Sequence, residues 1–398
     1  MRSLLLFSLG CLLVAEEAPS PRLADFVVAA PEVQEAREAH RADGRAAGAA
    51  DRLPDPMLRL GRTRFRTDHQ TWPSSEIALE QALPRWGERD ARRVMAEAGV
   101  QRSAAALRQA LGEVAAEAAT LLAEATAAHA RLALTKARLA RVTALENVVA
   151  AQVAAGGRSG AGTLAARSLR ATLALEVQDR QREIDDAEQE VRSLLGLAPE
   201  APLPAFAAPD PGQIGQRSTP AQDAAAAGRR EAEAGFLEAR AGRYPETAVG
   251  LRFERENAPD ETMTAIGLEV SVSLPVWQGA ASDLEDAALA RQRAAGAATR
   301  MADLRAKALI SRAQRAMAVA TQAHTAAQEA STRLTAEQDA LGRTIGTDNG
   351  PSLTEALDLL DRLAEAEDRR IAAHAEAQKA QAQLWRLAPP SLPAPELP

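Results

Sequence analysis

The stretch Leu83-Pro84-Arg85-Trp86-Gly87 decides the fold, because a counterpart, Leu274-Pro275-Val276-Trp277-Gln278, follows 191 residues later. Pro54 and Pro245 are separated by the same 191 residues. The chain has 398 residues and only four tryptophans. Two of the four, Trp86 and Trp277, are separated by the same 191 residues as the prolines, which indicates a duplication. Two copies of one structural unit are therefore expected.

Each copy contains segments in which apolar and polar residues alternate, which is typical of a β-strand with one apolar face. In the second copy these segments are 249–254 and 266–274. In the first copy 76–83 alternates in the same way, whereas the preceding segment, 57–66, is rich in arginine and less regular. Each copy is thus expected to hold a pair of strands, ended by Pro84 or Pro275.

Beyond the strands the apolar period becomes helical. Apolar residues recur at steps of four and three from Leu107 to Leu132, and again from Leu169 to Leu194 with one polar interruption at Arg180. Such seams are typical of coiled coils. Nothing stops a helix between about 88 and 155, which predicts a rod of roughly 100 Å. Shorter helices are expected at about 31–49 and 219–242.

Glycine-rich segments are expected to reverse these rods at 155–162 and 346–351. The predicted fold is mainly α with a small β part: two tandem repeats, each a strand pair plus a long antiparallel coiled-coil hairpin. The expected boundaries are 19–196 for the first repeat, 197–218 for a Pro-rich linker, 219–387 for the second repeat and 388–398 for a flexible tail.

The start of the chain resembles a secretory signal. Met1-Arg2 precedes an apolar run that ends near Ala15, and we place the signal at 1–18. Cys11, the only cysteine, has two open interpretations: a lipidation site exposed by cleavage before it, or an apolar residue of the signal. After the signal no run of ~18 apolar residues follows, so no helical membrane span is expected.

Composition excludes several classes of function. A net charge of −7 and a pI near 5.5 argue against nucleic-acid binding, which needs clustered Lys and Arg. The five histidines are scattered, with no pair at metal-ligand spacing, and no phosphate loop or nucleophile–base arrangement occurs. We therefore expect no enzyme activity, no cofactor and no metal site.

The strands are about as long as the ~9–11 residues that a tilted strand needs to cross a bilayer. Four strands cannot close, but three copies of the chain would supply twelve. The aliphatic row 266–274 would then face lipid. Four charged residues would face a barrel lumen, namely Glu80, Arg252, Glu254 and Glu269. A soluble, half-buried sheet would alternate in the same way, so the alternation leaves both interpretations open.

Several segments together resemble the TolC-type outer-membrane efflux family: 75–89, 270–279, the Gly-Arg hairpin turn and the helix end 194–199. The resemblance covers nearly the whole mature chain. It implies a homotrimer in the cell outer membrane, in contact with its lipid, with a twelve-stranded β-barrel and an α-helical barrel that extends through the periplasm.

In that family the helical tips dock a periplasmic adaptor (membrane fusion) protein, which joins the channel to an inner-membrane efflux pump. By position, the resemblance assigns this docking to the two glycine turns, with the residues Gly157, Arg158, Gly160, Gly346, Asp348 and Gly350. The charges of Arg158 and Asp348 are not needed for the turns themselves, which favours contact with a partner.

Within the family the sequence is most similar to the branch that serves heavy-metal efflux pumps, through the approach 80–84 to Gly87 and Arg89. The cargo would then be divalent heavy-metal cations. Two alternatives compete with a channel. A periplasmic adaptor normally has a single hairpin between split β halves, and a surface coiled-coil scaffold would not need four strands with an aliphatic face.

Overall fold

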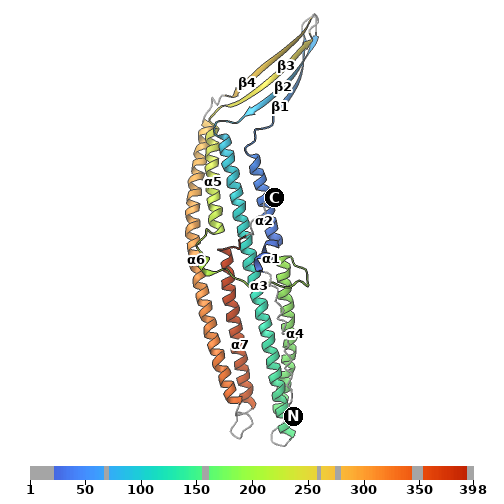
Figure 1. The fold of residues 1–398 in the computed structure, drawn as a ribbon, viewed down its shortest axis with the longest axis vertical. Coiled ribbons are helices and arrows are strands. Elements are labelled where there is room, and N and C mark those ends of the chain that lie inside the picture. Colours follow the sequence, from blue (N-terminus) through green and yellow to red (C-terminus); the bar gives the residue numbers. More distant parts are fainter. Residues whose placement is uncertain are drawn as a thin grey trace, which may run out of the picture. The chain divides into compact units, whose positions relative to one another are not determined.

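The computed structural model describes residues 22–66, 71–154, 161–257, 261–273, 279–342 and 353–391. The chain is mainly helical, with one small antiparallel sheet, as predicted (Figure 1). Its elements are α1 Leu23–Ala29, α2 Pro31–Ala49, β1 Met57–Arg66, β2 Thr71–Leu83, α3 Glu88–Ala154, α4 Ala161–Leu195, η1 Pro211–Gln213, α5 Pro220–Ala241, β3 Glu246–Asn257, β4 Thr262–Ser273, α6 Gly279–Gly342, α7 Leu353–Ala382 and η2 Gln383–Arg386.

The duplication predicted from prolines and tryptophans holds element by element. Adding 191 to the bounds of β2 gives 262–274, and β4 is Thr262–Ser273. The same shift carries the start of α3, Glu88, onto the start of α6, Gly279. It also preserves strand pairing, because Met57↔Glu80 in the first hairpin becomes Ala248↔Ser271 in the second, which is the observed pair. Both copies therefore have one fold.

The structure divides into two compact units. One contains Pro31–Ala116, Pro209–Thr325 and the chain from Gln383 onward. This sheet unit holds α2, all four strands, α5 and the first parts of α3 and α6. Its strand order is β1-β2-β3-β4, every pair antiparallel, so the pairing of β2 with β3 joins the two repeats in one sheet (Figure 1).

Local sequence explains where the elements of the sheet unit begin. Thr219 caps α5 through a reciprocal pair of hydrogen bonds with Gln222, and Pro220 occupies the first helical position. Gly87 adopts a φ of 82°, which a residue with a side chain rarely takes, and α3 begins at the next residue.

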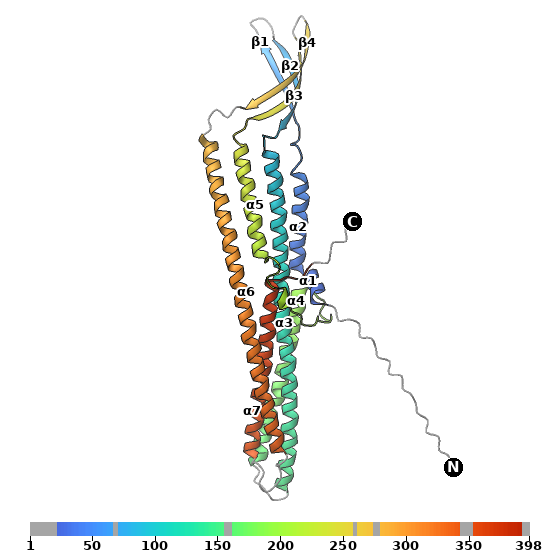
Figure 2. The same ribbon diagram turned by 60° about the vertical axis from the view of Figure 1, so that its left-hand side comes forward.

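The other unit contains the chain up to Ala30 together with Glu117–Ala208 and Ala326–Ala382. In this hairpin unit α3 packs against α4 through Ala128, Leu132 and Ile184. It packs against α7 through Ala127, Ile371 and Ala375. α4 and α7 lie on two sides of α3 in Figure 1, and Figure 2 shows the three helices running alongside one another. Three of these six contact residues are alanines, and their small side chains allow close approach of the helices.

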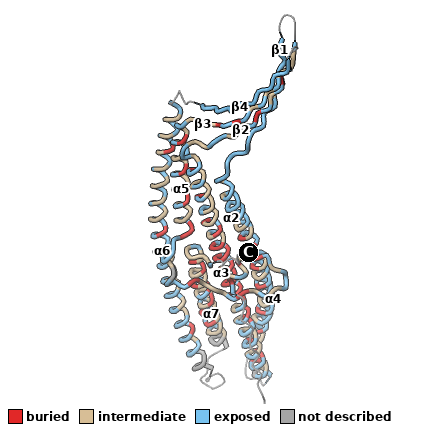
Figure 3. Tube along the Cα trace, turned by 45° about the horizontal axis from the view of Figure 1, so that its top comes forward, coloured by how far each residue is buried: buried red, intermediate tan, exposed pale blue. Residues whose placement is uncertain are grey.

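The predicted seam on α3 is confirmed, since every position from Leu107 to Leu132 in that series is buried, and Figure 3 shows the buried residues in red along this helix. On α4 the seam is confirmed at Leu173, Ile184 and Val191, whereas Leu195 is buried in place of the predicted Leu194.

Ion pairs between α3 and α7 follow the heptad period. Arg131 Nε lies 2.9 Å from Asp368 Oδ1, and seven residues further along each helix, in opposite directions, Arg138 pairs with Asp361. Near the end of α3 the buried carboxylate of Glu146 lies 3.1 Å from Arg167 and 3.3 Å from Arg170 on α4. Each partly exposed pair contributes only ~1 kcal/mol or less, so the pairs fix the register of the helices more than their stability.

Gly112 on α3 marks a close approach within the sheet unit. A Cβ added there would lie 2.7 Å from the carbonyl oxygen of Trp385 and 3.3 Å from Cα of Arg386. Backbone atoms cannot move aside as a flexible side chain can. The C-terminal segment is therefore seated on α3 at a position where only glycine fits.

We expect Gly112→Ala to lower the free energy of unfolding by about 1–3 kcal/mol through overpacking. Gly99→Ala is the matched control on the same helix, because nothing lies within 4 Å of an added Cβ there. It should raise stability by up to ~1 kcal/mol through helix propensity. Chemical denaturation of both variants measures the difference, and equal shifts would contradict the close approach.

Candidate functional site

The sheet has two chemically distinct faces. The register runs without a bulge, so residues of one face align in rows across the strands. Two complete rows are aliphatic or aromatic: Leu60–Ile77–Phe253–Ile266 and Leu58–Leu79–Leu251–Leu268. Val249 with Val270 and Thr247 with Val272 continue this face toward the helices. We call it the aliphatic face.

The opposite, polar face carries charges in the intervening rows. All four lumen residues predicted from the sequence, Glu80, Arg252, Glu254 and Glu269, lie on it. Arg252 lies 3.1 Å from Glu76 and 3.3 Å from Glu254, and Arg59 lies 3.2 Å from Glu80. The four residues thus share one face of the sheet, and their position in a barrel lumen stays a prediction. The prediction omitted Arg59 and Glu76. The alternation along β2 places Glu76 on the same face as Glu80, and on β1 Arg59 alternates with Leu58 and Leu60 of the aliphatic face.

Burial of the two faces is the reverse of that in a soluble sheet. Ile266 is 79% and Leu268 72% exposed, and all of β4 is exposed (Figure 3). On the polar face, by contrast, Ser74 and Ala78 are buried and the charged side chains cover one another. A soluble sheet would bury the aliphatic residues. Within the described residues of one chain, the aliphatic face is therefore left uncovered.

The aliphatic face ends in a polar row that also crosses all four strands, Arg62–Ser75–Arg255–Thr264. Arg64 and Arg66 follow on the same face of β1. The irregular, arginine-rich segment of the sequence is therefore a strand whose outer half lies beyond the aliphatic rows. The face is a band of limited height with polar residues at its outer edge.

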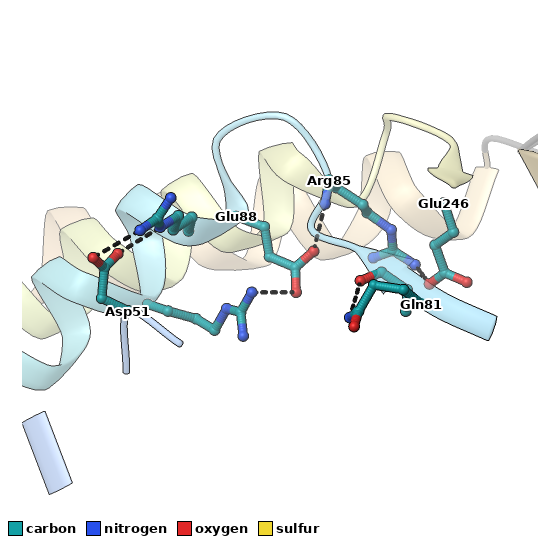
Figure 4. Close-up of polar contacts among 8 residues, drawn as sticks. Asp51, Gln81, Arg85, Glu88 and Glu246 are labelled. Atoms are coloured by element: carbon teal, nitrogen blue, oxygen red, sulfur yellow. Dashed lines mark hydrogen bonds and ion pairs between the residues drawn. The ribbon is translucent and has the colours of Figure 1, made fainter. Parts of the chain in front are cut away.

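A cluster of polar contacts connects the sheet to the helices (Figure 4). Arg89 makes a bidentate contact with Asp51, at 2.5 and 2.8 Å, which lowers the pKa of this exposed carboxyl. The backbone N–H of Arg85 donates to Glu88 at 2.8 Å, and its guanidinium pairs with Glu246. The motif around Gly87 and Arg89, whose resemblance suggested a heavy-metal branch, thus has a structural role here.

Several predicted site residues fall outside the described residues. They are the tip residues Gly157, Arg158, Gly160, Gly346, Asp348 and Gly350, together with Cys11 and the signal 1–18. Among the described residues, no group of three His, Cys, Asp or Glu is arranged to hold a metal ion. His40 forms a hydrogen bond with Ser103, and His129 forms one with Glu188.

No helix in the described part of the chain combines the length and the apolar character required to span a membrane.

The fold described above is similar to that of solved outer-membrane channels, which match almost the whole chain. The outer membrane protein VceC of Vibrio cholerae matches with a TM-score of 0.67 at 17% identity, over 92% of this chain and 95% of its own. The MtrE outer membrane channel of Neisseria gonorrhoeae, solved in its open state, matches with a TM-score of 0.67 at 17% identity, over 92% and 89%.

A membrane protein from Pseudomonas aeruginosa matches with a TM-score of 0.68 at 20% identity, over 92% of each chain. At these identities the likeness is one of fold. No protein-family model matches the sequence, and no curated protein matches it.

Proposed function

We propose that this chain is the outer-membrane channel subunit of a tripartite efflux system, a passive exit duct for substrates handed over by an inner-membrane pump. The exposed aliphatic face of the sheet, with charges on the opposite face, carries the proposal. Such a sheet is stable where lipid covers one face and water the other. Neither a periplasmic adaptor nor a coiled-coil scaffold has use for that arrangement.

Closure requires further copies of the chain, and we propose a homotrimer. Among the described residues, strands β1 and β4 each have one unpaired edge, which lipid would leave without hydrogen bonds. Several apolar residues of helix α6 are also exposed. Leu284, Met301, Leu304, Leu309 and Val319 are 48–66% exposed and fall within about half of the helix circumference. Neighbouring subunits would cover both.

Val270 and Ser271 are adjacent on β4 and point to opposite faces. Val270→Asp should reduce assembly, because a charge on the lipid face costs about 2–4 kcal/mol near mid-bilayer. Ser271→Asp, on the polar face, should be tolerated. Outer-membrane fractionation and the native mass of the detergent-extracted protein measure the effect. Equal tolerance of both substitutions would refute the assignment of the faces, and a soluble main species of the unaltered chain would refute the proposed location.

Export belongs to the same proposal, with 1–18 as the signal and the two repeats at 19–196 and 219–387. Cys11→Ala should leave membrane insertion largely intact, because the barrel rather than an acyl chain holds the protein in the membrane. Lipidation would be an additional anchor.

The periplasmic adaptor is proposed to dock at the glycine turns between the long helices of each repeat. Arg158→Glu combined with Asp348→Arg should weaken cross-linking to the adaptor and efflux, while trimer yield and location stay unchanged. Individual exposed pairs contribute ~1 kcal/mol or less, so the effect depends on several charges around the ring. Unchanged cross-linking and resistance in a normally expressed double variant would exclude these charges from docking.

We propose a cationic cargo, with divalent heavy-metal cations as the class that the sequence resemblance favours. Between the rows of Glu80 and Glu256 the polar face carries five glutamates and two arginines, a net charge of −3 in each chain. A conduit with negative walls attracts cations without binding them tightly.

Replacing Glu80 and Glu269 by Gln should therefore reduce the preference of the pore for cations, because two of the five carboxylates of each subunit lose their charge. The reversal potential of the purified channel in a planar bilayer under a salt gradient measures this preference. Glu35→Gln combined with Glu38→Gln, both on α2, is a control with the same loss of charge outside the sheet. An unchanged reversal potential in the double variant would refute the role of the polar face in selecting cargo.

A further inference from the structure

The strand pairing between the two repeats is a template for strand pairing between two copies of the chain. Within the chain, β2 of the first repeat pairs with β3 of the second, and Leu79 lies opposite Leu251. By the 191-residue offset β4 is the duplicate of β2, and β1 is the duplicate of β3. The free edges of the sheet thus belong to the duplicates of the two strands that already pair.

We infer that β4 pairs with β1 of a neighbouring subunit in the register that the duplication dictates. Shifting Leu79 forward by 191 gives Val270, and shifting Leu251 back by 191 gives Leu60, so Val270 lies opposite Leu60 of the partner subunit. This inference rests on the proposed channel and specifies the contact that closes it.

Toward the helices this register pairs residues of like chemistry, whereas toward the outer end Leu268 and Ile266 lie opposite Arg62 and Arg64 of the partner subunit. Val272 meets Leu58 of the partner subunit on the aliphatic face. On the polar face Ser271 meets Arg59 of the partner subunit, and Ser273 meets Met57 of the partner subunit. A slip of one residue would instead place the aliphatic residues of one strand opposite residues of the polar face of the other.

The same register has the stagger that a membrane barrel needs. The row that starts at Leu58 passes through Leu79 to Leu251, whose duplicate is Leu60, so each repeat advances the register by two residues. Six repeats would advance it by about twelve residues over twelve strands. With a rise of ~3.3 Å and a strand spacing of ~4.8 Å, the strands would tilt by about 35°. That tilt is typical of outer-membrane barrels, at ~35–45°.

Neighbouring registers fit less well. Placing Val270 opposite Leu58 of the partner subunit would halve the stagger and reduce the tilt to about 20°, below the usual range. Placing Val270 opposite Arg62 of the partner subunit would set the guanidiniums of Arg62, Arg64 and Arg66 of the partner subunit opposite Val270, Leu268 and Ile266. The duplicated register sets two guanidiniums opposite aliphatic residues and keeps the usual tilt.

Disulfide cross-linking of the full-length protein in its native membrane tests the register, because Cys11 is the only cysteine and Cys11→Ala removes it. Val270→Cys with Leu60→Cys should link subunits into covalent dimers and trimers under mild oxidation. Within one chain two strands lie between these positions, which are therefore more than about 14 Å apart, so any disulfide must join two chains. Val270→Cys with Leu58→Cys is the off-register control, and it should link about tenfold more slowly, because diagonal positions exceed disulfide reach.

The polar face provides a second pair in case the first disturbs insertion. Ser271→Cys should link to Arg59→Cys, and much more slowly to Met57→Cys. Faster linking of an off-register pair overturns the inferred register. A native trimer that links at none of the pairs overturns the pairing of β4 with β1 and leaves the proposed channel standing. A protein that is monomeric and links at none of them overturns both.

Discussion

The backbone pairing of β2 with β3 is the constraint on which the rest of the sheet depends. It joins strands from different repeats and so sets two hairpins side by side with their faces aligned. Because the register carries no bulge, aliphatic residues from both copies share one face and glutamates and arginines share the other. A shift of a single residue in this one pairing would mix lipid-compatible and charged side chains on both faces.

The helices solve a different packing problem with a different kind of residue. The core of the hairpin unit consists largely of alanines along α3, with a few leucines and isoleucines between them. Small side chains give little hydrophobic energy per residue but let long helices approach closely over many turns. The ion pairs Arg131–Asp368 and Arg138–Asp361, one heptad apart, fix the register of α3 against α7, which alanine contacts alone would specify poorly.

Much of this architecture could be predicted from the sequence because its signals are periodic. Repetition at 191 residues gave the two copies, and the seam from Leu107 to Leu132 gave the buried line of α3. Alternation also gave the correct face for Glu80, Arg252, Glu254 and Glu269. Contacts between distant segments could not be obtained in this way. The seat of the C-terminal segment on Gly112 and the link from Asp51 to Arg89 depend on where helices and loops meet, which no local period encodes.

The contact between Asp51 and Arg89 also shows where the two copies have diverged. The equivalent positions in the second repeat hold Gly242 and Ala280, which cannot form an ion pair. That repeat instead ties its strand entry to its helix through Arg243 and Glu285, 2.5 Å apart and more than a turn further along the helix. The two repeats thus share one backbone fold but connect strand and helix through different ion pairs. A twisting force on α3 would be resisted at another point than the same force on α6, so the two repeats should differ in mechanical response although their backbones are similar.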